Sequence, residues 1–225
     1  GVETCALPIL AKLVPIILLP IFWLHTGPDK THRLRNLWTL RGRAPLWAFP
    51  ICILAGFSPY AELGTELFAG LATYLSHWHF NDFAYSAIRS ALAPIDLAAA
   101  VHARWLCSLL LVIALVQALR QTADPLRAAY WSLGAYALLS PTMHPWYLLW
   151  VLPFMPLFPS AAWTLLAGLV FLAYEVLIDY GLSGIWVEKS WVRWAQYGPF
   201  YSVLAFDLFV RRRNRSHCAQ PTASI

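Results

Sequence analysis

The residues that could do chemistry gather in a few short stretches, and the most unusual is SPTMHPWYLLWVLPF, Ser140–Phe154. It sets His144 between Pro141 and Pro145 in sequence that is otherwise as apolar as a membrane span. Prolines remove backbone donors and stop helices, so we expect a turn that presents the histidine. Histidine titrates near neutral pH and can donate to a phosphate or bind a sugar hydroxyl. The alternative role for His144 is to cap a helix or anchor the chain at a membrane interface.

Two further cations, Lys12 and Arg104, stand near the ends of apolar runs. A charge within hydrocarbon costs at least about 2.5–3.5 kcal/mol, so it usually faces a partner or a wet cavity. If Lys12, Arg104 and His144 reach the same leaflet, they form a cationic cluster that an anionic lipid phosphate requires. The alternative for Lys12 and Arg104 is that their side chains extend to the headgroups.

The acidic residues and the possible metal-ligating residues are weaker indications of a functional site. Glu175 and Asp179 are expected to be exposed at the interface. Asp82 and Glu66 could serve as a general base, but each is expected to be a surface charge. His77 and His79 are two residues apart, which does not place both on one helix face, and the four cysteines have no metal-binding spacing. We therefore expect no metal site.

The composition indicates a membrane protein. The chain of 225 residues is 60% hydrophobic and 12% charged, whereas a soluble domain carries about 25% charged residues. Its 12 Trp and 10 Tyr suit membrane interfaces. We predict an all-α fold: a polytopic transmembrane helical bundle with interfacial amphipathic helices on the extracytoplasmic side. The expected spans are seven, at residues 6–24, 46–60, 97–119, 128–142, 146–158, 161–178 and 196–210. The fourth and fifth are short, and together they form a broken pair around His144, or one of them is re-entrant.

Basic residues set the predicted orientation. Eleven of the 16 Lys and Arg fall on one side of these spans, which the positive-inside rule makes cytoplasmic. They are Lys30, Arg33, Arg35, Arg41, Arg43, Arg120, Arg127, Arg211, Arg212, Arg213 and Arg215. The tail 211–225 is then cytoplasmic, and the Pro141–Pro145 turn faces outward. The net charge of +5 follows from topology and gives no support to nucleic-acid binding.

The longest external segment, residues 58–95, is expected to lie on the membrane. Its leucines at 63, 67, 71 and 75 recur every four residues, which is typical of an amphipathic interfacial helix. The following HWHFNDFAYSAI, His77–Ile88, interleaves aromatics with polar residues, and Asn81 could cap the next helix. This segment is either a connector resting on the membrane or a lid beside a lipid-facing active site.

The chain is expected to be a single transmembrane domain, residues 1–225, and a fragment of a longer protein. Its start, GVETCALPI, closely resembles the translated end of a common sequencing adapter, so residues 1–9 are interpreted as a sequencing artefact. The alternative is that residues 6–24 form a span whose flank was cut away.

Three stretches carry a resemblance to a known family. They are SPTMHPWYLLWVLPF, LAKLVPIILLP (Leu10–Pro20) and HWHFNDFAYSAI. Their order and spacing resemble the C-terminal half of GT-C superfamily membrane glycosyltransferases, in particular family 87 (the DUF2029 proteins), which depend on polyprenyl-phosphate-mannose. The resemblance covers most of the chain, and the motifs are moderately specific because they are mostly apolar and aromatic.

The resemblance implies an enzyme, a hexosyltransferase of the bacterial plasma membrane. It moves a hexosyl, by this likeness a mannosyl, group from a polyprenyl-phosphate carrier to an extracytoplasmic acceptor, and it needs no cofactor beyond this lipid-linked sugar donor. Lys12, Trp78, Asn81, His144 and Tyr147 are carried over as residues lining the substrate cavity, and Arg104 joins them from the charge argument. The catalytic residue is unknown, because the family's acidic residue belongs to an upstream external loop that nothing here matches. The chain alone is therefore expected to be inactive without the N-terminal half of the same protein.

The competing class is a multi-pass transporter or channel subunit, which would use the same intramembrane charges to pass a solute. Against it stand the lack of a visible internal repeat and the gathering of polar residues at one face instead of the midplane.

Overall fold

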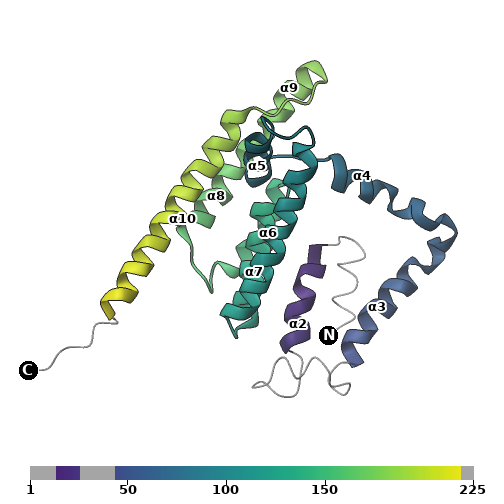
Figure 1. The fold of residues 1–225 in the computed structure, drawn as a ribbon, viewed down its shortest axis with the longest axis horizontal. Coiled ribbons are helices and arrows are strands. Elements are labelled where there is room, and N and C mark those ends of the chain that lie inside the picture. Colours follow the sequence, from purple (N-terminus) through teal and green to yellow (C-terminus); the bar gives the residue numbers. More distant parts are fainter. Residues whose placement is uncertain (1–13, 26–43, 219–225) are drawn as a thin grey trace, which may run out of the picture.

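The computed structural model describes residues 14–25 and 44–218, and this part of the chain is helical apart from one isolated bridge between Phe80 and Thr142 (Figure 1). The helices (α) and 3₁₀ helices (η) are η1 Val14–Leu18, α2 Leu19–His25, α3 Ala44–Phe57, η4 Ser58–Phe68, α4 Ala69–His77, α5 Ala84–Leu92, α6 Ala99–Gln121, α7 Pro125–Leu139, η5 Pro145–Trp150, η6 Leu152–Phe154, α8 Ala161–Leu169, η7 Val170–Glu175, α9 Val176–Ser183 and α10 Ser190–Cys218. The all-α prediction is confirmed for these residues.

Two helical stretches in the described part are long and apolar enough to cross a membrane, Ala99–Gln121 and the continuous Ala161–Ser183. Only 17% of the apolar window in the first and 33% in the second is buried. A helix in the core of a soluble protein would be covered on most sides, whereas these present Leu, Ile and Trp side chains outward, as contact with lipid requires. The structure thus points to membrane association.

The other predicted spans do not reach that length and hydropathy within the described residues. Helices α3 and α7 have 14 and 15 residues, and α10 has 29 but is more polar. The predicted span at 146–158 is no α-helix: it consists of η5, η6 and turns. Its prolines explain this, because each lacks the N–H that an α-helix needs from it. Seven crossings stay a prediction.

The core of the bundle is built around the Ser140–Phe154 stretch. Met143, Leu148 and Val151 from this stretch are buried together with side chains of α7, α8 and α10. The members of this core cluster are Leu133, Ala137, Met143, Tyr147, Leu148, Val151, Ala162, Trp163, Leu166, Val170, Tyr197 and Phe200. Gly134 permits close packing of α7 on α8, since a Cβ there would lie 3.0 Å from the Trp163 ring. The stretch that contains His144 is thus also the centre of packing.

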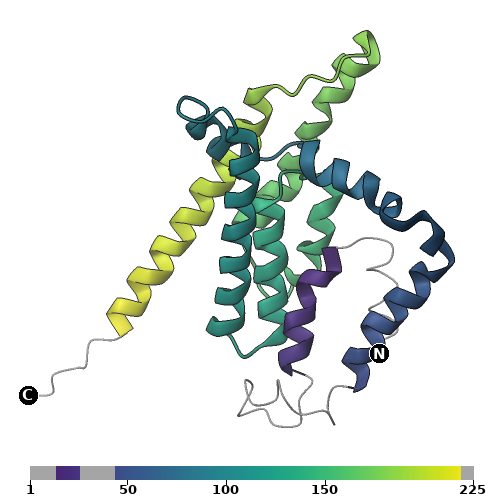
Figure 2. The ribbon, with the colours of Figure 1, turned by 45° about the vertical axis from the view of Figure 1, so that its right-hand side comes forward.

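Helices α6 and α7 form an antiparallel hairpin whose turn lies at the end of the bundle opposite to α5 and α9 (Figures 1 and 2). Asp124 caps α7 by accepting from the Leu126 backbone N–H at 3.0 Å, and Pro125 occupies the first turn. Arg120 and Arg127 flank this turn, and α10 descends toward the same end (Figure 1). The basic loop at 26–43 lies outside the described residues.

The segment 58–95 forms η4, α4 and α5, so the amphipathic helix expected over the leucines at 63–75 is divided between η4 and α4, and a separate helix follows Asn81 as expected. Gly64, with a φ of +53°, interrupts η4, and Asn81, with a φ of +48°, lies in the break between α4 and α5. Helix α3 and η4 extend away from the bundle in both views (Figures 1 and 2), and Leu63 and Leu75 are exposed. Exposed leucines on such an arm suit a segment that rests in the membrane interface.

The arrangement generates a test of topology. A single cysteine is introduced at His144 or at Arg213 in a chain whose own cysteines are replaced by serine. We expect an impermeant maleimide to label position 144 in intact cells and position 213 only after permeabilisation, because the positive-inside rule puts the arginine-rich end inside. A cysteine at Arg127 is the matched inner control. Labelling of position 144 only after permeabilisation would reverse the orientation.

Candidate functional site

Two polar motifs are joined by backbone hydrogen bonds at the end of the bundle that carries α5 and α9, which is the predicted outer end. Phe80 N–H donates to the Pro141 carbonyl at 3.0 Å, and Met143 N–H donates to the Phe80 carbonyl at 2.8 Å. The Asn81 side-chain amide also donates to the Met143 carbonyl, at 3.3 Å. Residues 62 positions apart are thereby held in register, so HWHFNDFAYSAI and SPTMHPWYLLWVLPF form one structural unit.

Asn81 connects this unit to α10 and to the loop before it through several hydrogen bonds, and it does not cap a helix. It is 2% exposed, and its side chain exchanges two hydrogen bonds with Gln196, at 3.1 and 3.0 Å. Its backbone N–H donates to Glu188 at 3.0 Å, and its carbonyl accepts from Tyr197 Oη at 2.9 Å. Asparagine tolerates the left-handed conformation found here better than most residues. Its buried amide is bonded to protein groups, so Asn81 holds its neighbours in place.

Asp82 is a buried carboxylate, which corrects the expectation that it is a surface charge. Its residue is 1% exposed, and Oδ1 accepts from the Ser86 backbone N–H at 2.6 Å, so Asp82 instead of Asn81 satisfies a donor in the first turn of α5. Burial raises the pKa of Asp82, against the opposing effects of Ser86, Arg193 and His79. Glu66 is exposed on η4, as predicted.

His79 lies between two carboxylates. Its Nδ1 is 3.8 Å from Asp82 Oδ2 and 3.9 Å from Glu188 Oε1. Both Nδ1 and Asp82 Oδ2 are buried and make no hydrogen bond in the described structure. The side chain of His79 is nevertheless 37% exposed, so the rest of the ring faces outward. The ring also packs near Tyr85, at 5.9 Å between centroids.

Arg104 fastens the end of α4. Its guanidinium donates to the carbonyls of Leu75 and Trp78, each at 3.0 Å, and stacks over the Tyr85 ring at 4.9 Å. Cations are favoured at helix C-termini, where carbonyls lack partners within the helix. The guanidinium is therefore bonded to helix carbonyls in the described structure, while Lys12 of the predicted cationic cluster lies outside the described residues. Trp78 is exposed beside it.

His144 and Tyr147 belong to an aromatic stack at the start of η5. The His144 ring lies parallel to Trp146 at 4.3 Å and packs on Phe80 at 5.2 Å. Tyr147 stacks on Trp150 at 4.3 Å, and its hydroxyl is 3.2 Å from that of Tyr74 on α4. The turn between Pro141 and Pro145 thus forms where the prolines predicted it, with His144 at the outer end.

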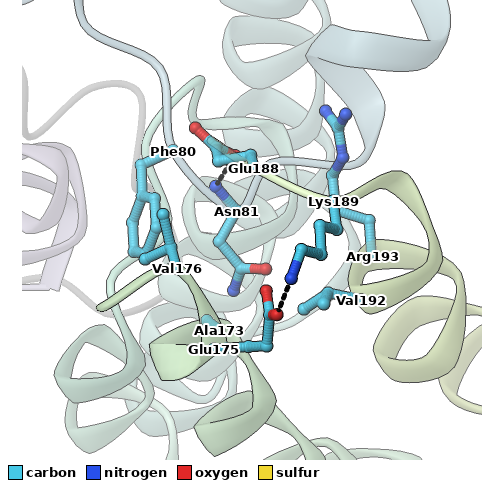
Figure 3. A pocket seen from close by; sticks show the side chains of 9 residues that line it. All are labelled: Phe80, Asn81, Ala173, Glu175, Val176, Glu188, Lys189, Val192 and Arg193. Atoms are coloured by element: carbon cyan, nitrogen blue, oxygen red, sulfur yellow. Dashed lines mark hydrogen bonds and ion pairs between the residues drawn. The ribbon is translucent and has the colours of Figure 1, made fainter. Parts of the chain in front are cut away.

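Lys189 forms ion pairs with two acidic residues. Its ammonium group binds Glu175 (Figure 3). It also lies 2.9 Å from a carboxylate oxygen of Asp179. These hydrogen bonds, that to Glu175 first, raise the pKa of Lys189. Glu175 and Asp179 were expected simply to be exposed, but each forms an ion pair. The space that these residues line with Asn81 and Glu188 holds about 10 Å³, no more than one water needs.

A larger, open cavity lies on the other side of Glu188. It has a volume of about 810 Å³, within the range of small-molecule sites. Its lining residues are His77, Trp78, His79, Trp186, Val187, Glu188 and Arg193. No group of three or more His, Cys, Asp or Glu suited to a metal ion occurs in residues 14–25 and 44–218.

Five of the six candidate residues, Trp78, Asn81, Arg104, His144 and Tyr147, meet at this end of the bundle. Lys12 and residues 1–9 lie outside the described part. Sequence reasoning missed Glu188, Gln196 and the aromatic Trp186. The sequence contains a usable signal: EKSWVRWAQY, residues 188–197, is rich in charged, amide and aromatic side chains and leads into the predicted apolar span at 196–210.

Comparison with known proteins adds one finding. Residues 89–179 match the family model described as the MptB C-terminal domain. The match spans less than half of the chain, includes Arg104, His144 and Tyr147, and stops before Glu188 and α10. It points to a mannosyltransferase-type membrane enzyme. No curated protein and no solved structure matches the chain.

The buried carboxylate generates a prediction on pH. The pKa of Asp82 is raised in the folded state above 3.8, the ordinary value of an aspartate. The contribution of the Asp82 carboxyl to the free energy of unfolding is therefore fully present below pH 3.8. This contribution is lost as pH rises through the folded pKa. Asp82→Asn keeps the acceptor for Ser86 and removes the buried charge, so the melting temperature of the variant relative to the parent should rise between pH 4 and pH 8.

Asp96→Asn is the control for this measurement, since its hydrogen bond to His102 lowers the pKa of Asp96. That substitution should leave relative stability nearly constant between pH 4 and pH 8, because a carboxyl with a lowered folded pKa loses its contribution only as pH falls below its ordinary value of 3.8. Thermal unfolding in detergent, followed by tryptophan fluorescence, measures both. A difference for Asp82→Asn that does not change with pH would contradict a buried ionisable carboxylate.

Proposed function

We propose that this chain is part of a membrane glycosyltransferase that moves a mannosyl group from a polyprenyl-phosphate carrier to an extracytoplasmic acceptor. The observation that carries the proposal is the match of residues 89–179 to the MptB C-terminal domain, since it contains the His144 turn. Within that class we propose the GT-C superfamily and family 87, for which the three motifs quoted above are the support.

Glycosyl transfer has two chemical requirements, of which this end of the bundle can meet one. Glycosyl transfer needs cationic or hydrogen-bonding groups near the departing lipid phosphate and a base for the acceptor hydroxyl. We assign the phosphate side to His144 and Lys12, with Tyr147 beside the histidine. Arg104 positions Trp78 by holding the end of α4. We place the base upstream of this chain.

Membrane association fits the substrate. A polyprenyl carrier is dissolved in the bilayer, so an enzyme using it needs a polar site at the edge of a lipid-facing bundle. Helix α6 presents its apolar side chains outward, and the polar unit lies at its N-terminal end, where Arg104 reaches α4. A donor lipid could therefore place its phosphate at the unit while its chain stays along α6.

The first test is the reaction. Membranes holding this chain are incubated with radiolabelled polyprenyl-phosphate-mannose, with and without the co-expressed upstream half of the protein. We expect labelled product only with both parts, because loss of a general base alone forfeits about 10²- to 10⁴-fold. Turnover by the chain alone would place the base within it, and absence of product from the combined parts would refute the proposal.

A second test addresses His144. In the complete enzyme, His144→Ala should lower kcat/KM by about 10- to 150-fold, the equivalent of one lost charge-assisted hydrogen bond of about 1.5–3 kcal/mol. His102→Ala is the matched control, since His102 pairs with Asp96 in the described structure and should retain activity. Normal activity of His144→Ala at equal membrane expression would leave His144 with the interface role alone.

A further inference from the structure

We propose that the open cavity lined by Trp78, His79, Trp186 and Glu188 binds the hydroxyl groups of a neutral saccharide, on the acceptor side of the transfer. This inference rests on the proposed function and adds to it the substrate that this cavity takes.

The first argument is the polarity of His79. Its Nδ1 is buried between Asp82 and Glu188, at 3.8 and 3.9 Å. With Nδ1 facing two carboxylates, Nε2 is the ring nitrogen left for the cavity. Since Nδ1 is buried and the side chain is 37% exposed, Nε2 lies on the open part of the ring. A sugar hydroxyl can exchange a hydrogen bond with it, because a hydroxyl both donates and accepts.

The second argument is that two exposed tryptophan rings form part of the cavity wall. Trp78 and Trp186 are 55% and 48% exposed, and both line the cavity. Trp186 is held edge-on by Phe80 at 5.4 Å and by Tyr180 at 5.9 Å. Indoles offer a large apolar face at low entropic cost, which suits the C–H face of a pyranose ring. The volume of about 810 Å³ accommodates more than one such ring.

The third argument is the balance of charge. The cavity contains the Glu188 carboxylate, with buried Asp82 behind His79. Of the nearby cations, Lys189 is paired with Glu175 and Asp179, whereas Arg193 lines the cavity and donates to Ser86 Oγ. One carboxylate thus stands against one guanidinium in the wall, which leaves the cavity without the excess positive charge that a donor phosphate needs. Sugar hydroxyls need no such excess and can donate to Glu188. The charge favours the acceptor over the donor.

Binding is measured on the full chain in nanodiscs by saturation-transfer difference NMR, with an α-linked methyl mannobioside as the probe. Glu188→Gln and Trp186→Ala should each weaken its binding by about ten-fold, as loss of a charge-assisted hydrogen bond or of one ring contact implies. Trp105→Ala and Glu66→Gln are the matched controls, since both residues are exposed away from the cavity, and should leave binding unchanged. Trp186→Phe, which keeps a ring, should retain most of the affinity and guards against misfolding of the alanine variant.

The result that would overturn the inference is an unchanged affinity in Glu188→Gln and Trp186→Ala, or no binding to the parent chain. Displacement of the mannobioside by farnesyl phosphate would also overturn it, because the cavity would then take the donor. The two proposals fail separately. Transfer by the complete enzyme without these binding effects refutes the cavity assignment alone, and binding without transfer refutes the proposed reaction alone.

Discussion

The outer end of this protein depends on one pairing, the backbone hydrogen bonds that join Phe80 to Pro141 and Met143. The Asn81 side chain extends this pairing to α10 through Gln196. In hydrocarbon or at its edge, an unpaired peptide group costs several kcal/mol, so a chain that breaks its helices there must satisfy each group within the protein. The prolines end α7, and the freed carbonyl of Pro141 is taken by Phe80. Cavity, aromatic stack and buried carboxylate are all positioned by this arrangement.

The cations of this end are largely used to build it. Arg104 closes α4, Lys189 joins α9 to the loop before α10, and Arg193 reaches Ser86 on α5. Arg104 meets the unsatisfied carbonyls at the C-terminal end of α4, whereas Lys189 and Arg193 bind side chains. A count of positive residues near an interface therefore overstates how many remain for a ligand. The open cavity differs from the His144 stack in holding a carboxylate, Glu188, beside Arg193.

Much of this could be predicted from sequence where the signal is local. The long apolar run of α6 and the proline-bounded turn at His144 follow from composition and from the missing proline donor. The burial of Asp82 could not be predicted, because it depends on Ser86, Arg193 and Tyr85 closing around it from two helices. Nor could the role of Glu188, whose partner Asn81 lies 107 residues away. Charged residues in a polar stretch appear exposed until their distant partners are known.

The stretch from Pro145 to Phe154 has a consequence for how the protein is made. It runs as 3₁₀ helix and turns toward the inner end, where Phe158 meets Arg127. Lipid cannot stabilise such a backbone, which is tolerated at membrane depth only when protein surrounds it. Leu148 and Val151 find their contacts on α8 and α10, which are synthesised later. If this stretch crosses the membrane as predicted, its insertion must wait for these downstream neighbours, and the polar unit beside His144 is completed only once the ribosome has passed α10.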